Sequence, residues 1–253
     1  MRCRAFAGRN LKELLRDPIS YIFCLGLPLL MLLLMTVVNQ GIPAQAQMVI
    51  FDIDHLGPGI AVFSLTFVML FSCLQVSKDR AGAFLIRLYA SPMTAFDYIA
   101  GYSLPLLAVA LGQGMITFAS SAVIGAVLGT PLQPGNMLLS LLTLLPSAVL
   151  FMGFGMLFGS LLNDKAAPPV TSVLITVSAL VGGIWMDVDM LGGALRDICA
   201  VLPFYHAVQA SRAAMLGNTS GILLPLGVVS LYAAAVYTLA VIAFHRKMKS
   251  DQK

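Results

Sequence analysis

The residues of this chain that could do covalent chemistry are few and scattered. Ser160 and His206 are the candidates for a nucleophile and a base, which a membrane-embedded hydrolase would need at one depth. The expected topology puts Ser160 near the cytosolic end of a span and His206 on the external side, so the two should not meet. The four cysteines lie far apart and form no Cys-x-x-Cys pair. We therefore expect no catalytic residue and no metal site.

Recognition of a partner is the chemistry that the charged residues favour. Lys78-Asp79-Arg80 opens a charged, helix-capable stretch, 78–90, which Ser91-Pro92 closes because proline disfavours a helical residue before it. Residues 55–77 before it and 98–163 after it contain no Asp, Glu, Lys or Arg. We interpret 78–90 as a short cytosolic helix of a membrane protein, placed to meet a partner. The alternative is a plain juxtamembrane linker.

Polar residues inside the apolar runs are candidates for a transport pathway. Gln113, flanked by Gly112 and Gly114, is the best of them, and Thr117 lies one helical turn further on. Such side chains mark pathways or satisfy a neighbouring helix, and both alternatives stay open here. We find no ionisable residue within any expected span, which argues against an ion-coupled transporter.

The composition decides the broad class. Of the 253 residues, 59% are hydrophobic and 10% are charged, whereas soluble domains are about 25% charged. A soluble fold of this size could not hide so much apolar surface, so the solvent must be mostly lipid. The net charge of +4 makes nucleic acid a poor candidate partner.

The elements expected from the apolar runs make an all-α membrane protein with a single domain over 1–253. An amphipathic helix over residues 2–16, with basic residues on one face, should lie in the bilayer interface; the alternative is a solvated basic leader that only sets the topology. Between the last two spans, the charge-free stretch 198–211 is too short to cross and is typical of re-entrant, external helices. The six expected transmembrane helices are 18–38, 60–76, 99–128, 137–162, 170–186 and 222–244.

The distribution of basic residues predicts the orientation. With six crossings, 13 of the 15 Lys and Arg residues fall on the side of the two termini, and Arg196 and Arg212 fall on the other. The positive-inside rule therefore predicts that both termini are cytosolic.

Several ordered motifs resemble the permease subunits of ATP-binding-cassette (ABC) transporters of the type-2 exporter family. The amphipathic helix ends at Leu15-Arg16-Asp17-Pro18, and a Gly-rich turn, Gly182-Gly183-Ile184-Trp185, follows the fifth span. In the segment between the second and third spans, Ala81 stands where many members carry a second Glu. The residues there that match the family are Lys78-Asp79-Arg80, Gly82, Leu85, Leu88 and Ser91-Pro92, and the Pro-aromatic step is Pro203, Phe204, Tyr205 and His206.

The resemblance implies a half-transporter in the plasma (inner) membrane of a bacterium or archaeon. It would pair with a second permease copy or a paralogue and with separate ABC ATPase subunits, which bind ATP and Mg. The chain itself has no Gly-Lys dipeptide and hence no phosphate-binding loop of the Walker type, so we expect neither enzymatic activity nor a cofactor in it. The expected contacts to the ATPase are Asp79, Arg80, Gly82, Leu85, Arg87 and Leu88.

The resemblance implies that the cargo could be drug-like, lipid or otherwise amphipathic, and the short loops and the lack of charged lining favour an amphipathic or lipid-like one. The competing hypotheses are a membrane-embedded enzyme and an ion-coupled transporter that works without an ATPase partner.

Overall fold

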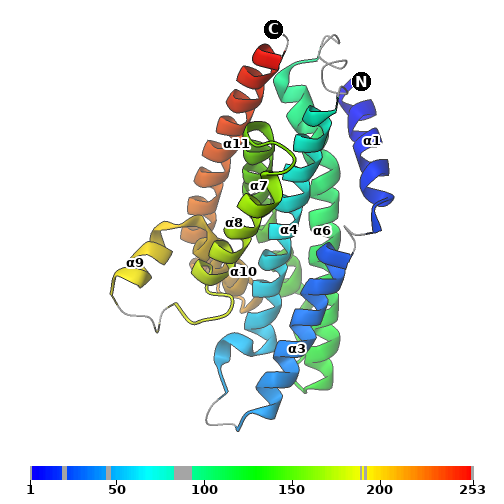
Figure 1. Cartoon of the computed structure of the whole chain (residues 1–253). Coiled ribbons are helices and arrows are strands. Elements are labelled where there is room, and N and C mark those ends of the chain that lie inside the picture. Colours follow the sequence, from blue (N-terminus) through cyan, green and yellow to red (C-terminus); the bar gives the residue numbers. More distant parts are fainter. Residues whose placement is uncertain are drawn as a thin grey trace.

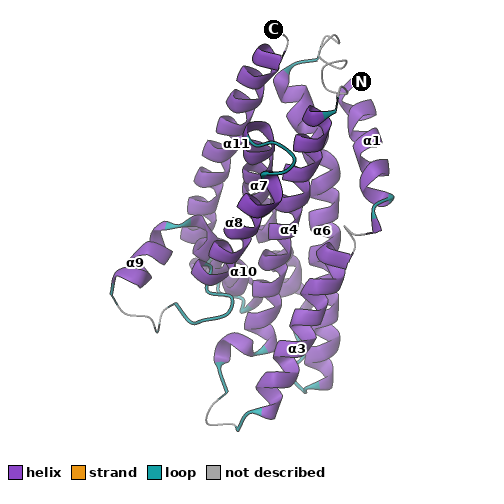
Figure 2. Ribbon diagram, in the orientation of Figure 1, coloured by secondary structure: helices purple, strands orange, loops and turns teal. Residues whose placement is uncertain are grey.

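A computed structural model describes residues 2–18, 22–43, 47–82, 93–188, 190 and 193–251. Every regular element in these ranges is helical, with no strand among them, which confirms the predicted all-α class (Figure 2). The helices are α1 (Arg2–Leu15), η1 (Ile22–Gly26), α3 (Leu27–Gly41), η3 (Val49–Phe51), α4 (Ile53–Ala81), α6 (Ala95–Val127), α7 (Pro134–Leu161), α8 (Ala167–Val181), α9 (Ala194–Val201), α10 (Pro203–Met215), η4 (Thr219–Gly221) and α11 (Leu223–Asp251).

Five of the described helical segments are long and apolar enough to cross a membrane: Ile22–Gly41, α4, Phe96–Val127, α7 and Thr219–Lys247. The predicted fifth span, 170–186, corresponds to α8, which has 15 residues and is therefore about 22 Å long. A hydrocarbon layer is about 30 Å thick, so α8 falls short of a full crossing by length. It ends before the predicted boundary because Gly182 and Gly183 follow it, and Gly183 has a φ of +69°, which terminates helices. Six crossings thus remain a prediction.

Helix α4 forms the centre of the bundle, between α6, α7, α8 and α10 (Figure 1). In its most apolar window 83% of the residues are buried, against at most 50% in the other long helices. The close packing depends on Gly155 and Gly159 of α7, where a Cβ would collide with the backbone oxygens of Met69 and Cys73. Gly125 and Gly129 have the same spacing, but they lie at the end of α6 and form its closing turn, in which the Gly125 carbonyl accepts from the Thr130 N–H.

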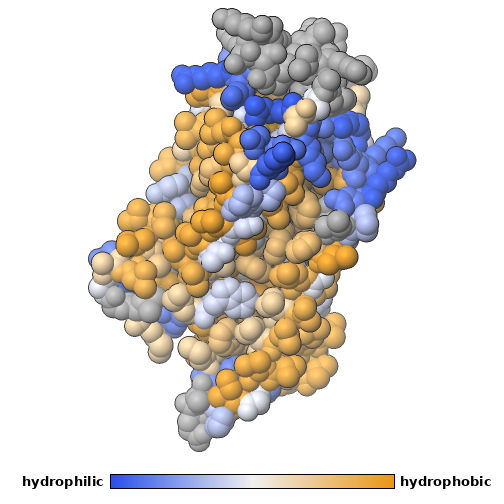
Figure 3. All heavy atoms as spheres, viewed as in Figure 1, coloured by the Kyte–Doolittle hydropathy of each residue, from blue (hydrophilic) through white to orange (hydrophobic). Residues whose placement is uncertain are grey.

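The two chain ends lie at the same end of the bundle. Figure 1 shows the start of α1 and the last turns of α11 together at the top, and the end of α3 at the bottom. On the face seen in Figure 3, hydrophilic residues gather at the upper end and apolar residues cover most of the middle. This polarity is that of a bundle with one end in water and its flank in lipid.

The charged cluster Lys78-Asp79-Arg80 belongs to the last turn of α4, not to a separate helix beginning at residue 78. No glycine or proline separates the cluster from the apolar run, so the helix continues until Gly82, whose backbone is extended. The rest of the predicted short helix, 83–90, lies outside the described residues. The chain resumes at Met93, and α6 begins with a capping box in which Thr94 and Asp97 satisfy each other's backbone N–H groups.

Candidate functional site

The amphipathic helix α1 packs its apolar side against α6. The ring of Phe6 makes edge-to-face contacts with Tyr98 and Tyr102, at centroid distances of 5.8 and 4.9 Å. Gly101 lies beneath the same ring, where a Cβ would collide with it. One turn along α1, Asn10 is fully buried and its Nδ2 donates to the Gly101 carbonyl at 3.1 Å. These contacts bring the neighbouring residue of α1, Arg9, to the end of α4.

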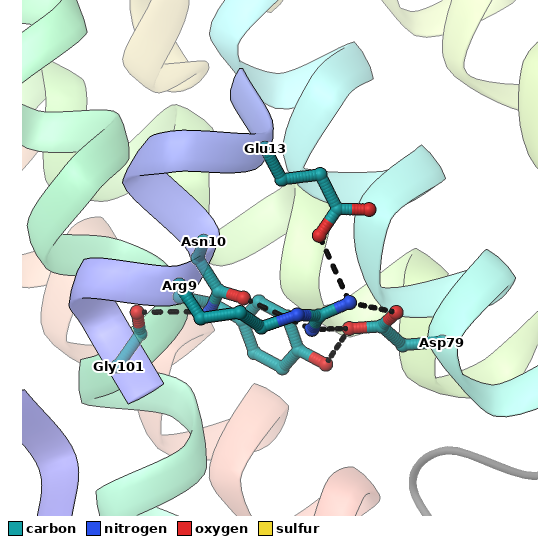
Figure 4. Close-up of polar contacts among 6 residues, drawn as sticks. Arg9, Asn10, Glu13, Asp79 and Gly101 are labelled. Atoms are coloured by element: carbon teal, nitrogen blue, oxygen red, sulfur yellow. Dashed lines mark hydrogen bonds and ion pairs between the residues drawn. The ribbon is translucent and has the colours of Figure 1, made fainter. Parts of the chain in front are cut away.

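Arg9 and Asp79 form a two-pronged ion pair across 70 residues of sequence (Figure 4). Arg9 Nη1 donates to Asp79 Oδ2 at 2.8 Å, and Nη2 donates to Oδ1 at 3.2 Å. Tyr102 Oη donates to Oδ2 at 2.7 Å, and Arg9 Nη2 also pairs with Glu13 at 2.9 Å. This cluster of Arg9, Asp79 and Tyr102, called here the α1–α4–α6 latch, joins three helices through one carboxylate.

Burial and charge act in opposite directions on the latch. Burial of the Arg9 guanidinium disfavours its charged form, but the hydrogen bond and the charge of Asp79 outweigh this, so the pKa of Arg9 is raised. The Asp79 side chain is 10% exposed, whereas that of Arg9 is 36% exposed. A carboxylate buried to that degree requires its partners, and the latch therefore holds α1 against the end of α4.

Arg80 makes a second connection, to the end of α7. Its Nη1 donates to the carbonyls of Gly159, Ser160 and Leu162 at 3.2, 2.6 and 3.2 Å. A guanidinium at a helix C-terminus satisfies carbonyls that lack intrahelical partners and complements the negative end of the helix dipole. The last turn of α4 is thus joined to α1 and α6 by Asp79 and to α7 by Arg80.

Gln113 lies at the wall of an apolar cavity between α1, η1, α4 and α6. The cavity measures about 280 Å³, and its lining among the described residues is apolar except for Gln113. Gln113 is 1% exposed, and neither its Oε1 nor its Nε2 has a hydrogen-bond partner in the described part of the chain. Thr117, also buried, donates to the backbone carbonyl of Gln113 at 2.8 Å and does not line the cavity.

The Pro-aromatic step begins α10. Pro203 occupies the first turn, and the buried ring of Phe204 stacks on Phe151 of α7 at 5.8 Å. Tyr205 contacts the ring of His206, and His206, 9% exposed, pairs through Nε2 with the Ala200 carbonyl at 2.8 Å. The step therefore fixes the corner between α9 and α10 on α7.

Ser160 and His206 are not brought together as a nucleophile and a base. Ser160 Oγ donates to the Met156 carbonyl at 2.7 Å within its own helix, and His206 is held by the backbone of α9. Both side chains are thus bound to backbone carbonyls, and neither hydrogen bond joins Ser160 to His206.

Comparison with known proteins decides the family. The family model described as ABC-2 type transporter matches residues 1–216. The chain belongs to this family. It is also similar to "Putative transport permease YvfS" of Bacillus subtilis (strain 168), with 29% identity over 205 residues, which is 78% of each chain. ABC-2 chains are membrane subunits for transport, not catalytic ones, and in general they work with ABC ATPase subunits.

The ABC-2 chain presents its expected coupling residues in two groups. Asp79 and Arg80 turn inward, to the latch and to the end of α7, whereas Gly82 is exposed directly after α4. Leu85, Arg87 and Leu88 lie outside the described residues. Direct contact of Asp79 with another subunit conflicts with its burial, so its side chain is better suited to positioning the segment that comes after α4.

Two members of the latch, Arg9 and Tyr102, could not be predicted from the sequence alone. Helical periodicity places Arg9 on the basic, outward face of α1, and Tyr102 lies in a long apolar run with no charged neighbour. No spacing rule links residue 9 to residue 79. The detectable signal is Asp79 itself, the single acidic residue in the charged last turn of α4, because a carboxylate at the end of a span requires a cation.

Proposed function

We propose that this ABC-2 chain is the membrane-spanning permease of an ATP-driven exporter, coupled to separate ATPase subunits through residues 83–92. In this proposal the partner ATPases bind ATP and Mg, and two permease chains, identical or paralogous, form the substrate path. Both termini face the cytosol of a bacterium or archaeon, and α8 completes six crossings.

The observation that carries the proposal is how the two ends of 83–92 are anchored. On one side, Asp79 and Arg80 join the end of α4 to α1, α6 and α7. On the other, the capping box of Thr94 fixes the start of α6. A partner that moves the ten residues between these anchors moves several helices as a unit, which is what transmission of an ATPase cycle to a transport path requires.

The cavity beside Gln113 supports an uncharged, amphipathic cargo. No charged residue lines it among the described residues, so an ion would be desolvated there without compensation. Its volume of about 280 Å³ is near the lower end of ligand sites, at about 300 Å³. A cargo with an apolar body and one hydroxyl, carbonyl or amide group would give the Gln113 amide the partner it lacks.

The coupling proposal is tested by affinity purification of the tagged chain from its native membrane in mild detergent, with mass spectrometry of the proteins that come with it. Replacing 83–92 by a Gly-Ser segment of equal length should remove the ATPase subunit, and so should Leu85→Glu with Leu88→Glu. The matched control is Leu195→Glu with Leu216→Glu, which introduces the same charges at exposed leucines of α9 and the end of α10. Retention of the ATPase by the 83–92 variants would reject this docking segment.

A further inference from the structure

The groove between α7 and α11, at the end where the chain termini lie, combines an apolar floor with a basic rim. It is lined by Leu157 and Leu161 of α7 and, on α11, by Leu239, Ile242, Ala243, Arg246 and Lys247. The α11 residues recur at intervals of three and four, so they form one stripe along the helix. The groove has a volume of about 450 Å³, larger than the cavity beside Gln113.

The groove results from how the two helices pack. They are in close contact at Gly153, where a Cβ would lie 3.2 Å from Val236 and 3.4 Å from the backbone of Tyr237. Beyond this point three of the lining residues remain about half exposed: Leu161 by 51%, Leu239 by 54% and Ile242 by 43%. From Leu239 to Arg246 the stripe rises about 10 Å along the helix axis. Apolar side chains therefore lead directly to the two cations.

The charge of the groove is unbalanced, because its lining by the described residues carries two cations and no carboxylate. The basic face of α1 provides a contrast. There Arg9, Lys12 and Arg16 share a hollow with Glu13 and Asp17, and Arg9 is paired with Glu13 at 2.9 Å. A negative ligand is therefore favoured at the α7–α11 groove more than at α1.

We propose that the α7–α11 groove binds an anionic phospholipid of the bilayer. One acyl chain lies along Leu157, Leu161, Leu239 and Ile242, and the phosphate lies at Arg246 and Lys247. The ligand is an amphiphile because apolar and basic lining meet within one groove, and it is anionic because Arg246 and Lys247 are the charged residues in the described part of the rim. The two cations stand at the end of a long apolar helix, which is where the phosphate layer of a bilayer meets a crossing helix. The site is separate from the latch and from the cavity beside Gln113.

The test uses the purified full-length chain in nanodiscs of phosphatidylcholine with and without phosphatidylglycerol. Native mass spectrometry counts the lipids retained after release and reports the oligomeric state in the same spectrum. The wild-type chain should retain phosphatidylglycerol in preference to phosphatidylcholine. Arg246→Gln with Lys247→Gln should weaken this preference about 30-fold, about fivefold for each cation lost near an anionic surface.

Two controls separate the groove from general basicity. Lys12→Gln with Arg16→Gln removes the same charge from α1 and should leave the preference unchanged. Ala243→Phe fills the groove without changing its charge and should lower retention as strongly as the loss of both cations.

Several results would overturn the proposal. These are an unchanged preference in the Arg246 and Lys247 variant, an equal loss in the Lys12 and Arg16 variant, or full retention by Ala243→Phe. Displacement of the lipid by inorganic phosphate alone would indicate a phosphate site without a role for the acyl chain. A groove variant that separates a dimer without changing lipid retention would assign the surface to a second copy of the chain.

Discussion

The latch predicts that Arg9 and Asp79 contribute to stability jointly and not separately. In Arg9→Met the apolar stem of the side chain is kept, but the carboxylate of Asp79 loses both guanidinium hydrogen bonds and keeps only the one from Tyr102. In Asp79→Asn the hydrogen bond from Tyr102 can persist, and Arg9 still has Glu13. The double variant removes both charges and leaves no carboxylate without a cation.

The expected magnitudes depend on burial. Removing one partner of a buried ion pair costs about 3–5 kcal/mol. Because the Arg9 side chain is 36% exposed, water can reach part of the site, and we reduce the expected cost of Arg9→Met to about 2 kcal/mol. Asp79→Asn should cost about 1–2 kcal/mol, since one hydrogen bond persists. Independent effects would sum to about 3–4 kcal/mol, whereas the latch predicts about 2 kcal/mol for the double variant.

The assay is unfolding in mixed micelles with a rising fraction of sodium dodecyl sulfate, followed by circular dichroism for all four chains. Glu13→Gln serves as the control, because its exposed i, i+4 pair with Arg9 should be worth no more than about 0.5 kcal/mol. If the two single effects add to within about 0.5 kcal/mol, the pair is not coupled and the latch is refuted. With the ATPase present, the single variants should still co-purify with it but lose stimulation of ATP hydrolysis by cargo.

Three further substitutions test the remaining contacts by the same unfolding titration. Arg80→Met should cost about 1–2 kcal/mol, because three carbonyls at the end of α7 lose their donor, and Arg80→Lys should recover part of this stability. If Arg80→Met leaves the stability unchanged, Arg80 does not cap α7. Gly155→Ala should cost about 1–3 kcal/mol, because the added Cβ collides with α4. Gly112→Ala, with open space around its Cβ, should be neutral or stabilising. Equal effects of the two substitutions would contradict the close packing of α7 on α4. Gln113→Leu should leave the stability equal or about 1 kcal/mol higher, while the transport of a neutral amphiphile falls several-fold. The control is Gln75→Leu, which removes another buried amide without a partner in the described chain. If transport falls equally in the two variants, Gln113 is not part of the pathway.

Local sequence patterns are sufficient for the class of protein and for most of its helices. A chain with 59% hydrophobic residues and uncharged runs as long as 98–163 must be helical in lipid, because helices satisfy their backbone groups internally. The expected spans 99–128 and 137–162 divide that run correctly into α6 and α7. The boundaries are less exact, because hydropathy reports where the bilayer ends and not where a helix ends. For that reason α4 continues to Ala81, five residues beyond the predicted span.

The sequence by itself determined that a charged cluster follows the second span, that a basic amphipathic helix precedes the first span, and that the motifs resemble those of ABC-2 permeases. These properties depend on composition and on spacing within about 15 residues, and both can be recognised in the sequence without knowledge of tertiary contacts. Only the tertiary structure decided what the charges contact: Asp79 meets Arg9 and Tyr102, and Arg80 meets the end of α7. The physical reason is that an isolated carboxylate specifies the need for a cation but not which one, and that choice depends on how α1, α6 and α7 pack around α4.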